Sequence, residues 1–112
     1  MDELLDISET SDNGVPVLAL RGEIDLSSSP QLREALVRLQ EEEPPVVVLD
    51  LSDVTFLDST GLGILIGALK RRESAGGDLR LVITRPNLLK VFEITGLTTV
   101  FRLFPSRAEA CT

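Results

Sequence analysis

The residues best suited to chemistry stand together in the stretch "FLDSTGLG" near the middle of the chain. It combines one acid, two hydroxyls and two glycines: Asp58, Ser59, Thr60, Gly61 and Gly63. An apolar run precedes these residues and an amphipathic segment follows them, which predicts a strand-to-helix turn that presents Ser59. The hydroxyl of Ser59 then has three candidate roles: a nucleophile, a helix cap, or the acceptor of a covalent group.

Ser59 lacks the partners of a catalytic nucleophile. The chain contains no histidine, the usual general base for serine, and the neighbouring Asp58 is a weak activator at neutral pH. Leu57 stands where the G-x-S-x-G elbow of hydrolases needs its first glycine. The dinucleotide pattern G-x-G-x-x-G fails because Ile66 occupies its third glycine position, and no G-K-[ST] phosphate loop occurs. An enzyme, including a nucleotide hydrolase, is therefore the least favoured class.

A helix cap and a phosphate acceptor remain. Asp58 or Ser59 fits the N-cap position, where a side-chain oxygen accepts from an unpaired N–H of the first helical turn. Phosphorylation of Ser59 would add roughly −1.5 to −2 charge at a helix N-terminus, which tolerates an anion, so the fold would persist. A partner docking on this turn would have to desolvate the new dianion beside Asp58, at a cost on the order of several kcal/mol. The turn is therefore predicted to be a phosphorylation switch on binding.

The glycines near Ser59 have two interpretations. Gly61 and Gly63 remove side chains from the approach to Ser59. Gly63 and Gly67, four residues apart, also fit a smooth helix face packed closely on a sheet. This packing is the favoured interpretation for Gly67.

Composition narrows the class of protein. The 112 residues fit a single domain, residues 1–112, and 43% hydrophobic residues are enough for a core. A net charge of −7 argues against a nucleic-acid binder, because such proteins neutralise phosphates with clustered Lys and Arg. The run "KRR" that begins at Lys70 is interpreted as charge at a helix C-terminus. The lone Cys111 is interpreted as a tail residue.

No membrane span or secretory signal is predicted. The apolar stretch Gly61–Leu69 is about half of the roughly 20 residues that a spanning helix needs. The N-terminal "MDELLDISET" has no basic segment followed by an apolar one. We expect a cytoplasmic protein that uses no metal and no other cofactor.

A small α/β fold must position the turn. "LLDIS" and "VPVLALRG" flank the turn signal "SDNG" at Ser11–Gly14 and predict a hairpin. Pro30–Gln40 then places apolar residues at helical spacing. Two N-cap registers fit this helix: Ser29 before the proline, or Ser28 in a capping box with Gln31.

The rest of the chain alternates strands and helices. A β-branched run at Val46–Ser52 predicts a central strand, and helical spacing from Leu62 ends at Gly76 or Gly77. The remaining predicted elements are a strand at Leu79–Ile83, a helix at Pro86–Gly96, a strand at Val100–Phe104 and a helical turn in "PSRAEA". This order predicts an α/β fold with a mixed sheet of about five strands, in which an antiparallel N-terminal hairpin precedes parallel βαβ units.

Three segments carry a resemblance to a known family. They are "GEIDLSSSPQLREAL" from Gly22, "VVVLDLSDVTFLDSTGLGILIGALKR" from Val46 and "VFEITGLTTVF" from Val91. In order and spacing, over nearly the whole chain, they resemble bacterial anti-sigma factor antagonists of the STAS domain family. The resemblance implies a mixed sheet with helices packed mainly on one side.

The resemblance also implies a function. In that family the unphosphorylated antagonist binds an anti-sigma factor that is also a serine kinase of the GHKL type, and so frees a sigma factor for transcription. The kinase phosphorylates the serine after Asp in the D-S-[ST]-G-L-G turn, which is Ser59 here. A PP2C-type phosphatase removes the phosphate. Phosphorylation breaks the complex, as the charge argument expects.

The resemblance extends to a set of site residues. It places Asp25, the acid of the G-E-[IL]-D turn, beside Ser59 in the docking surface. The partner-binding residues predicted in this way are Glu23, Asp25, Ser27, Ser28, Asp58, Ser59, Thr60, Gly61 and Leu62. A polar residue that ends a strand before a helix cap is an equally good interpretation of Asp25. Thr60 ranks below Ser59 as phosphate acceptor because the motif position is the first hydroxyl.

Two further points bear on the function. An alternative keeps the fold but makes the chain a non-catalytic STAS module of a larger signalling assembly, with Ser59 only a helix cap. The chain also stops at Thr112, soon after "PSRAEA", so the last helix of the family is predicted to be short here.

Overall fold

The computed structural model describes residues 5–112, so Leu4 of the predicted first strand lies outside the described residues. In this range the strands are β1 Leu5–Asp12, β2 Val15–Ile24, β3 Val46–Leu57, β4 Asp78–Val82 and β5 Arg102–Phe104. The helices are α1 Ser29–Gln40, α2 Ser59–Ser74, α3 Pro86–Ile94, the 3-10 helix η1 Leu97–Thr99 and α4 Arg107–Ala110. The predicted alternation of strands and helices is confirmed.

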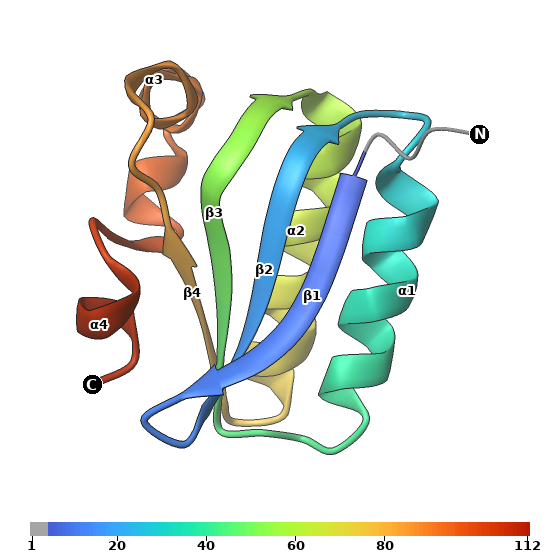
Figure 1. Cartoon of the computed structure of the whole chain (residues 1–112), viewed down its shortest axis with the longest axis vertical. Helices are drawn as coiled ribbons and strands as arrows, with labels where there is room; N and C mark the ends of the chain where they lie inside the picture. Colours follow the sequence, from blue (N-terminus) through green and yellow to red (C-terminus); the bar gives the residue numbers. More distant parts are fainter. Residues whose placement is uncertain (1–4) are drawn as a thin grey trace.

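The strands form one mixed sheet in the order β1-β2-β3-β4-β5. β1 and β2 are antiparallel and are joined at Asn13 and Gly14, whose φ values of 55° and 78° suit a tight hairpin turn. The pairs β2–β3, β3–β4 and β4–β5 are parallel, as predicted. Because β2 and β3 are parallel neighbours, their carboxyl ends lie together at one edge of the sheet (Figure 1).

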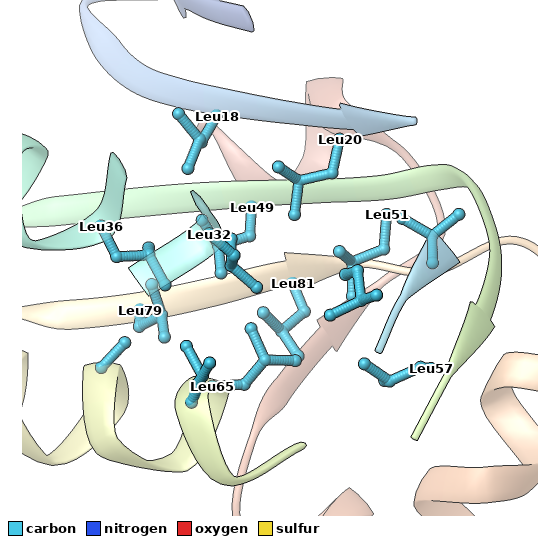
Figure 2. Packing of buried hydrophobic residues seen from close by; sticks show 14 of the residues in the cluster. Leu18, Leu20, Leu32, Leu36, Leu49, Leu51, Leu57, Leu65, Leu79 and Leu81 are labelled. Carbon is cyan, nitrogen blue, oxygen red and sulfur yellow. The ribbon is translucent and has the colours of Figure 1, made fainter. Parts of the chain in front are cut away.

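The main core lies between the sheet and helices α1 and α2, which cover the same face (Figure 1). Figure 2 shows leucines of α1 and α2, such as Leu36 and Leu65, directed toward strand leucines such as Leu49 and Leu81. These side chains are almost fully buried. Burial of each side chain stabilises the fold by about 2 kcal/mol. The packed layer therefore holds α2 in a fixed position relative to the ends of the strands.

Several element boundaries differ from the predicted ones, most of them by one or two residues. β3 continues past Ser52 to Leu57, because its second half pairs with the end of β2 after shifts in register. α2 begins at Ser59 with Asp58 as its N-cap, which is one of the two predicted caps, and its polar first turn precedes the apolar spacing that starts at Leu62. β5 begins at Arg102 because the N–H groups of Val100 and Phe101 both donate to the Leu97 carbonyl.

The end of α2 confirms Gly76, one of the two glycines predicted to follow the helix. Gly76 has φ +82° and supplies the left-handed residue after the helix, whereas Gly77 packs against Arg72. A Cβ at Gly77 would lie 2.6 Å from Nε of Arg72. The run "KRR" from Lys70 was interpreted as charge at the C-terminus of this helix. Its last residue, Arg72, is only 2% exposed, so this side chain is packed inside the fold and is not a surface charge.

Helix α4 covers part of the opposite face of the sheet (Figure 1). Cys111, interpreted as a tail residue, is 1% exposed and packs with Val17, Val48 and Val82, a burial that the sequence did not predict. The segment is held by hydrogen bonds as well, because Arg80 Nη1 donates to the Ala110 carbonyl at 2.8 Å. Burial raises the pKa of the Cys111 thiol.

An ion pair attaches α4 to the centre of the sheet. The guanidinium of Arg107 donates to Oδ2 of Asp50 from Nη2 at 2.7 Å and from Nε at 3.1 Å. Burial raises the pKa of Asp50, but hydrogen bonds from the Ser52 hydroxyl and N–H, together with Arg107, outweigh it and leave the pKa below its usual value. Asp50 is therefore a stabilising anion in the folded chain.

We expect Arg107→Ala to lower the free energy of unfolding by about 1 kcal/mol near neutral pH, because the half-buried Asp50 loses its cation. The pKa of Asp50 is lowered in the folded state, so its contribution is present above the unfolded pKa of about 3.8 and disappears as the pH falls through the folded value. The loss should therefore shrink toward zero in acid. Thermal unfolding followed at a series of pH values measures it.

Arg102→Ala is the matched control, because the Arg102 side chain is 60% exposed in its ion pair with Asp78. It should change stability by less than about 0.5 kcal/mol. Equal losses for the two variants, or a loss for Arg107→Ala that does not depend on pH, would contradict the assignment.

Candidate functional site

The candidate site is built by two loops at the carboxyl edge of the sheet. One follows β2 and leads into α1, and the other joins β3 to α2 (Figure 1). The N–H of Asp58 donates to the Ile24 carbonyl at 3.1 Å, which ties the second loop to the end of β2. The structure thus brings together the two segments that the sequence predicted to form one surface.

Asp58 caps α2, and Ser59 does not. Oδ1 of Asp58 accepts from the Gly61 N–H at 2.9 Å, and the backbone of Asp58 is extended, as expected for an N-cap. Ser59 is the first helical residue and is exposed. Among residues 5–112, no group forms a hydrogen bond with the Ser59 hydroxyl. The alternative in which Ser59 serves only as the cap is therefore wrong, because the acid before it supplies the cap.

The loop after β2 is stabilised by its own polar groups. Oδ1 of Asp25 accepts from the N–H of Ser27 at 2.9 Å and of Ser28 at 3.1 Å. The Ser28 hydroxyl donates to the Glu23 carbonyl at 2.8 Å and accepts from the Asp25 N–H at 3.0 Å. Asp25 therefore does what its structural interpretation predicted, and its other carboxylate oxygen, Oδ2, has no hydrogen bond among the described residues.

The start of α1 settles the choice between the two cap registers. Ser28 occupies the N-cap position, but its hydroxyl makes no cap hydrogen bond because it is used within the loop. The hydroxyl of Ser29 donates back to the Leu26 carbonyl at 3.2 Å. The side-chain amide of Gln31 donates to the Leu5 carbonyl at 3.0 Å, which ties α1 to β1.

The predicted site residues divide by exposure. Glu23, Ser27 and Ser59 are exposed, and Asp25, Asp58 and Thr60 are partly exposed. Ser28, Gly61 and Leu62 are buried, and their side-chain positions support the two loops from within. The surface available to a partner is therefore the acidic and hydroxyl-bearing rim formed by the first two groups.

Gly61 is required by the packing of α2 on the strand ends. A Cβ at this position would lie 2.6 Å from both Cγ2 of Ile24 and Cδ1 of Leu57. The absence of a side chain lets the first turn of α2 contact the ends of β2 and β3. Gly67 has the opposite environment, because a Cβ there would meet nothing within 4 Å. The close packing on the sheet predicted for Gly67 was therefore wrong.

Sequence reasoning missed two apolar residues beside the acidic rim. Leu26 is 73% exposed in the loop after β2, and Phe56 is 49% exposed near the end of β3. Exposed apolar side chains next to polar groups are typical of protein docking surfaces. A signal for Leu26 was present in the sequence, because it is an apolar residue set among polar loop residues with no helical or strand spacing to bury it.

A groove extends from this surface along the outer side of α1. Its volume is about 710 Å³, and its lining combines the two loops with α1: Leu26, Ser29, Pro30, Arg33, Glu34, Val37, Arg38, Glu41 and Thr60. The groove is open and mixed in polarity, so it suits a macromolecular surface more than a small substrate.

No centre for metal chemistry accompanies the site. Over residues 5–112, no group of three or more Cys, Asp or Glu side chains is arranged to hold a metal ion. In the same range no helix has the length and apolar character to cross a membrane.

Known proteins share the sequence pattern and the fold of this chain. Residues 6–110 match the family described as "STAS domain". The chain is 42% identical to an anti-sigma-B factor antagonist of Bacillus subtilis over 81 residues, which cover 72% of this chain and 73% of that protein. It is 34% identical to the anti-sigma-B factor antagonist of Listeria monocytogenes, covering 92% and 90% of the two chains. A crystal structure of an anti-sigma factor antagonist from Mycobacterium paratuberculosis matches with a TM-score of 0.87 and 32% identity, covering 95% of this chain and 90% of that one.

Asp58 caps α2 and Ser59 does not, and this difference has a measurable consequence for stability. Asp58→Ala should lower the free energy of unfolding by about 1 kcal/mol, because the Gly61 N–H loses its acceptor. Ser59→Ala should change it by less than about 0.5 kcal/mol, since the hydroxyl is exposed and unbonded. Chemical denaturation of both variants tests this. Asp58→Ser, which restores a capping oxygen, is the control, and a larger loss for Ser59→Ala than for Asp58→Ala would contradict the assignment.

Proposed function

This chain belongs to the STAS domain family, and we propose that it is an anti-sigma factor antagonist whose binding is switched off by phosphorylation of Ser59. In its unphosphorylated form it would bind an anti-sigma factor that is also a serine kinase of the GHKL type, and so release a sigma factor for transcription. A PP2C-type phosphatase would restore the binding form. The chain itself catalyses nothing in this scheme, needs no cofactor, binds no nucleic acid directly and acts in the cytoplasm as a single domain.

The observation that carries the proposal is the state of the Ser59 hydroxyl. It is exposed at the first position of a sixteen-residue helix whose cap is already supplied by Asp58. The hydroxyl has no structural task within residues 5–112, so a kinase can modify it without removing a bond that the fold needs. The N-terminus of α2 also offers backbone N–H groups and a favourable dipole to the added phosphate.

Binding in the unmodified state would use the rim around Ser59. Leu26 and Phe56 supply exposed apolar area, while Glu23, Asp25 and Asp58 supply negative charge. An anti-sigma factor that fits this rim would present apolar residues beside basic ones. Ser27 and Thr60 would add hydroxyls that can donate or accept at the edge of the contact.

Phosphorylation would act on the complex and not on the fold. The kinase transfers the γ-phosphoryl group of ATP to Oγ of Ser59, with release of ADP and of the hydroxyl proton. The product carries roughly two additional negative charges next to Asp58. The partner's surface, which fits the small hydroxyl, would then have to accommodate a larger dianion and remove its hydration water. This desolvation costs on the order of several kcal/mol when the charge is left unpaired.

The other candidate, a non-catalytic STAS module of a larger assembly in which Ser59 is only a cap, has no supporting observation at the turn. Asp58 performs the capping, and the Ser59 hydroxyl is left for another purpose.

The proposal is tested with the GHKL-type anti-sigma kinases of the source genome, each purified and titrated with this chain. We expect one of them to add a single phosphate to Ser59 in the presence of ATP. Ser59→Ala should bind that kinase at least as tightly as the unmodified chain and stay bound when ATP is added. Ser59→Glu should bind at least about tenfold more weakly.

Thr60→Ala is the control variant, because Thr60 also carries a hydroxyl at the site; it should still be phosphorylated and released. Phosphate mapped to Thr60 alone, or equal affinities of the Ala and Glu variants at position 59, would refute the switch.

A further inference from the structure

One row of positions on α2 connects Ser59 with a basic residue. Ser59, Gly63, Gly67 and Arg71 are spaced by four residues, so each lies about one turn after the last in a row that winds gradually around the helix. At 1.5 Å per residue the row is about 18 Å long. It begins with the proposed phosphate acceptor, continues over two positions without a side chain, and ends at an arginine.

The fold gives no reason for glycine at the two middle positions. Neither Gly63 nor Gly67 has a positive φ, and a Cβ at either would meet nothing within 4 Å. Gly61, two residues before Gly63 and on the opposite side of the helix, differs because its Cβ would collide with Ile24 and Leu57. Glycine inside a helix is less stable than alanine, so Gly63 and Gly67 weaken α2 without an internal benefit. The space above them is left open for something outside the chain.

That space is a groove between α1 and α2. Its volume is about 150 Å³, and its lining is Arg33, Leu36, Gly63, Ile64, Gly67, Ala68 and Arg71. The lining contains two charged residues, and both are arginines, although the whole chain carries a net charge of −7. Neither Arg33 nor Arg71 forms an ion pair with a described residue. The groove is therefore a locally positive strip with an apolar floor.

We infer that this groove is the docking site for an acidic α-helix of the same partner that reads Ser59. The inference rests on the proposed function, since it takes the partner to be the anti-sigma factor. Two positions without side chains, one turn apart, allow a second helix to approach the backbone of α2 closely. The unpaired guanidinium groups of Arg33 and Arg71 select carboxylates on that helix.

The groove is continuous with the acidic rim. Arg33 lines both this groove and the larger one along α1, and the larger groove reaches Leu26 and Thr60 beside Ser59. A helix that follows the row from Arg71 therefore arrives at the Ser59 hydroxyl. A phosphate on Ser59 would then collide with the last turn of the docked helix. Phosphorylation would in this way weaken binding in the groove as well as at the turn.

The first test separates stability from binding. The double variant Gly63→Gln with Gly67→Gln places two good helix formers in open space, so its Tm should rise by about 5 °C. Its affinity for the anti-sigma kinase should nevertheless fall at least about tenfold, because the side chains hold a docked helix away. Gly61→Ala is the opposite control and should lower Tm through its collision with the strand ends.

The second test examines charge with a defined probe. Two helical peptides of the same apolar pattern, one carrying glutamates and the other lysines, are titrated into the isotopically labelled chain and followed by NMR. The glutamate peptide should shift the amide resonances of Gly63 and Gly67, and the lysine peptide should not. Arg33→Glu with Arg71→Glu should remove the response, whereas Lys90→Glu, on α3 and away from the groove, should retain it.

The outcomes distinguish the inference from the proposed function. If no anti-sigma kinase of the source genome binds the unmodified chain, the proposed function fails, and the peptide titration still decides the chemistry of the groove. If a kinase binds the chain and the glutamine variant with equal affinity, the groove inference is overturned while the function stands. A concentration-dependent dimer of the unmodified chain that the glutamine variant abolishes would assign the groove to a second copy, and would also overturn it.

Discussion

The parallel pairing of β2 with β3 is the constraint on which the rest of the site depends. Because the two strands run side by side in the same direction, the loops that leave them emerge at the same edge of the sheet. The hydrogen bond from the Asp58 N–H to the Ile24 carbonyl continues the pairing by one step into the second loop. Gly61 then allows α2 to start directly against the strand ends. Residues more than thirty positions apart in the sequence thus share one surface.

Each of the two loops is stabilised by an aspartate that accepts hydrogen bonds from backbone N–H groups. Asp25 and Ser28 satisfy the backbone of the loop after β2, and Asp58 satisfies the first turn of α2. The hydroxyls of Ser27, Ser59 and Thr60 form no hydrogen bond with a described residue, and Ser59 is the one at the first position of α2. A chemical change at the Ser59 hydroxyl would therefore alter the surface without releasing bonds inside the fold. Rigidity here also keeps the apolar side chains of Leu26 and Phe56 presented to a partner.

The sequence predicted the fold well because its signals are local. Alternating spacing, a hairpin turn at Asn13 and prolines at helix starts each act over a few residues, and their order leaves few topologies. What it predicted poorly depends on tertiary contact. The length of β3 is set by pairing with β2, the burial of Cys111 by the opposite face of the sheet, and the different tasks of Gly61 and Gly67 by what lies above each. The Ser28 hydroxyl forms its hydrogen bond within the loop and not with the first turn of α1. These two hydrogen bonds are similar in strength, so residue spacing alone does not predict which one forms.

If Ser59 is phosphorylated as proposed, the charge distribution explains how one phosphate would control binding on a chain that is already acidic. Phosphorylation changes the net charge from −7 to about −9, which alters the distant field of the molecule little. At physiological ionic strength a charge acts over only about 8 Å, so the phosphate is felt by groups around the rim and not by Arg71, about 18 Å along α2. The proposed switch would therefore act locally, and the basic end of the α1–α2 groove would keep its charge in both states.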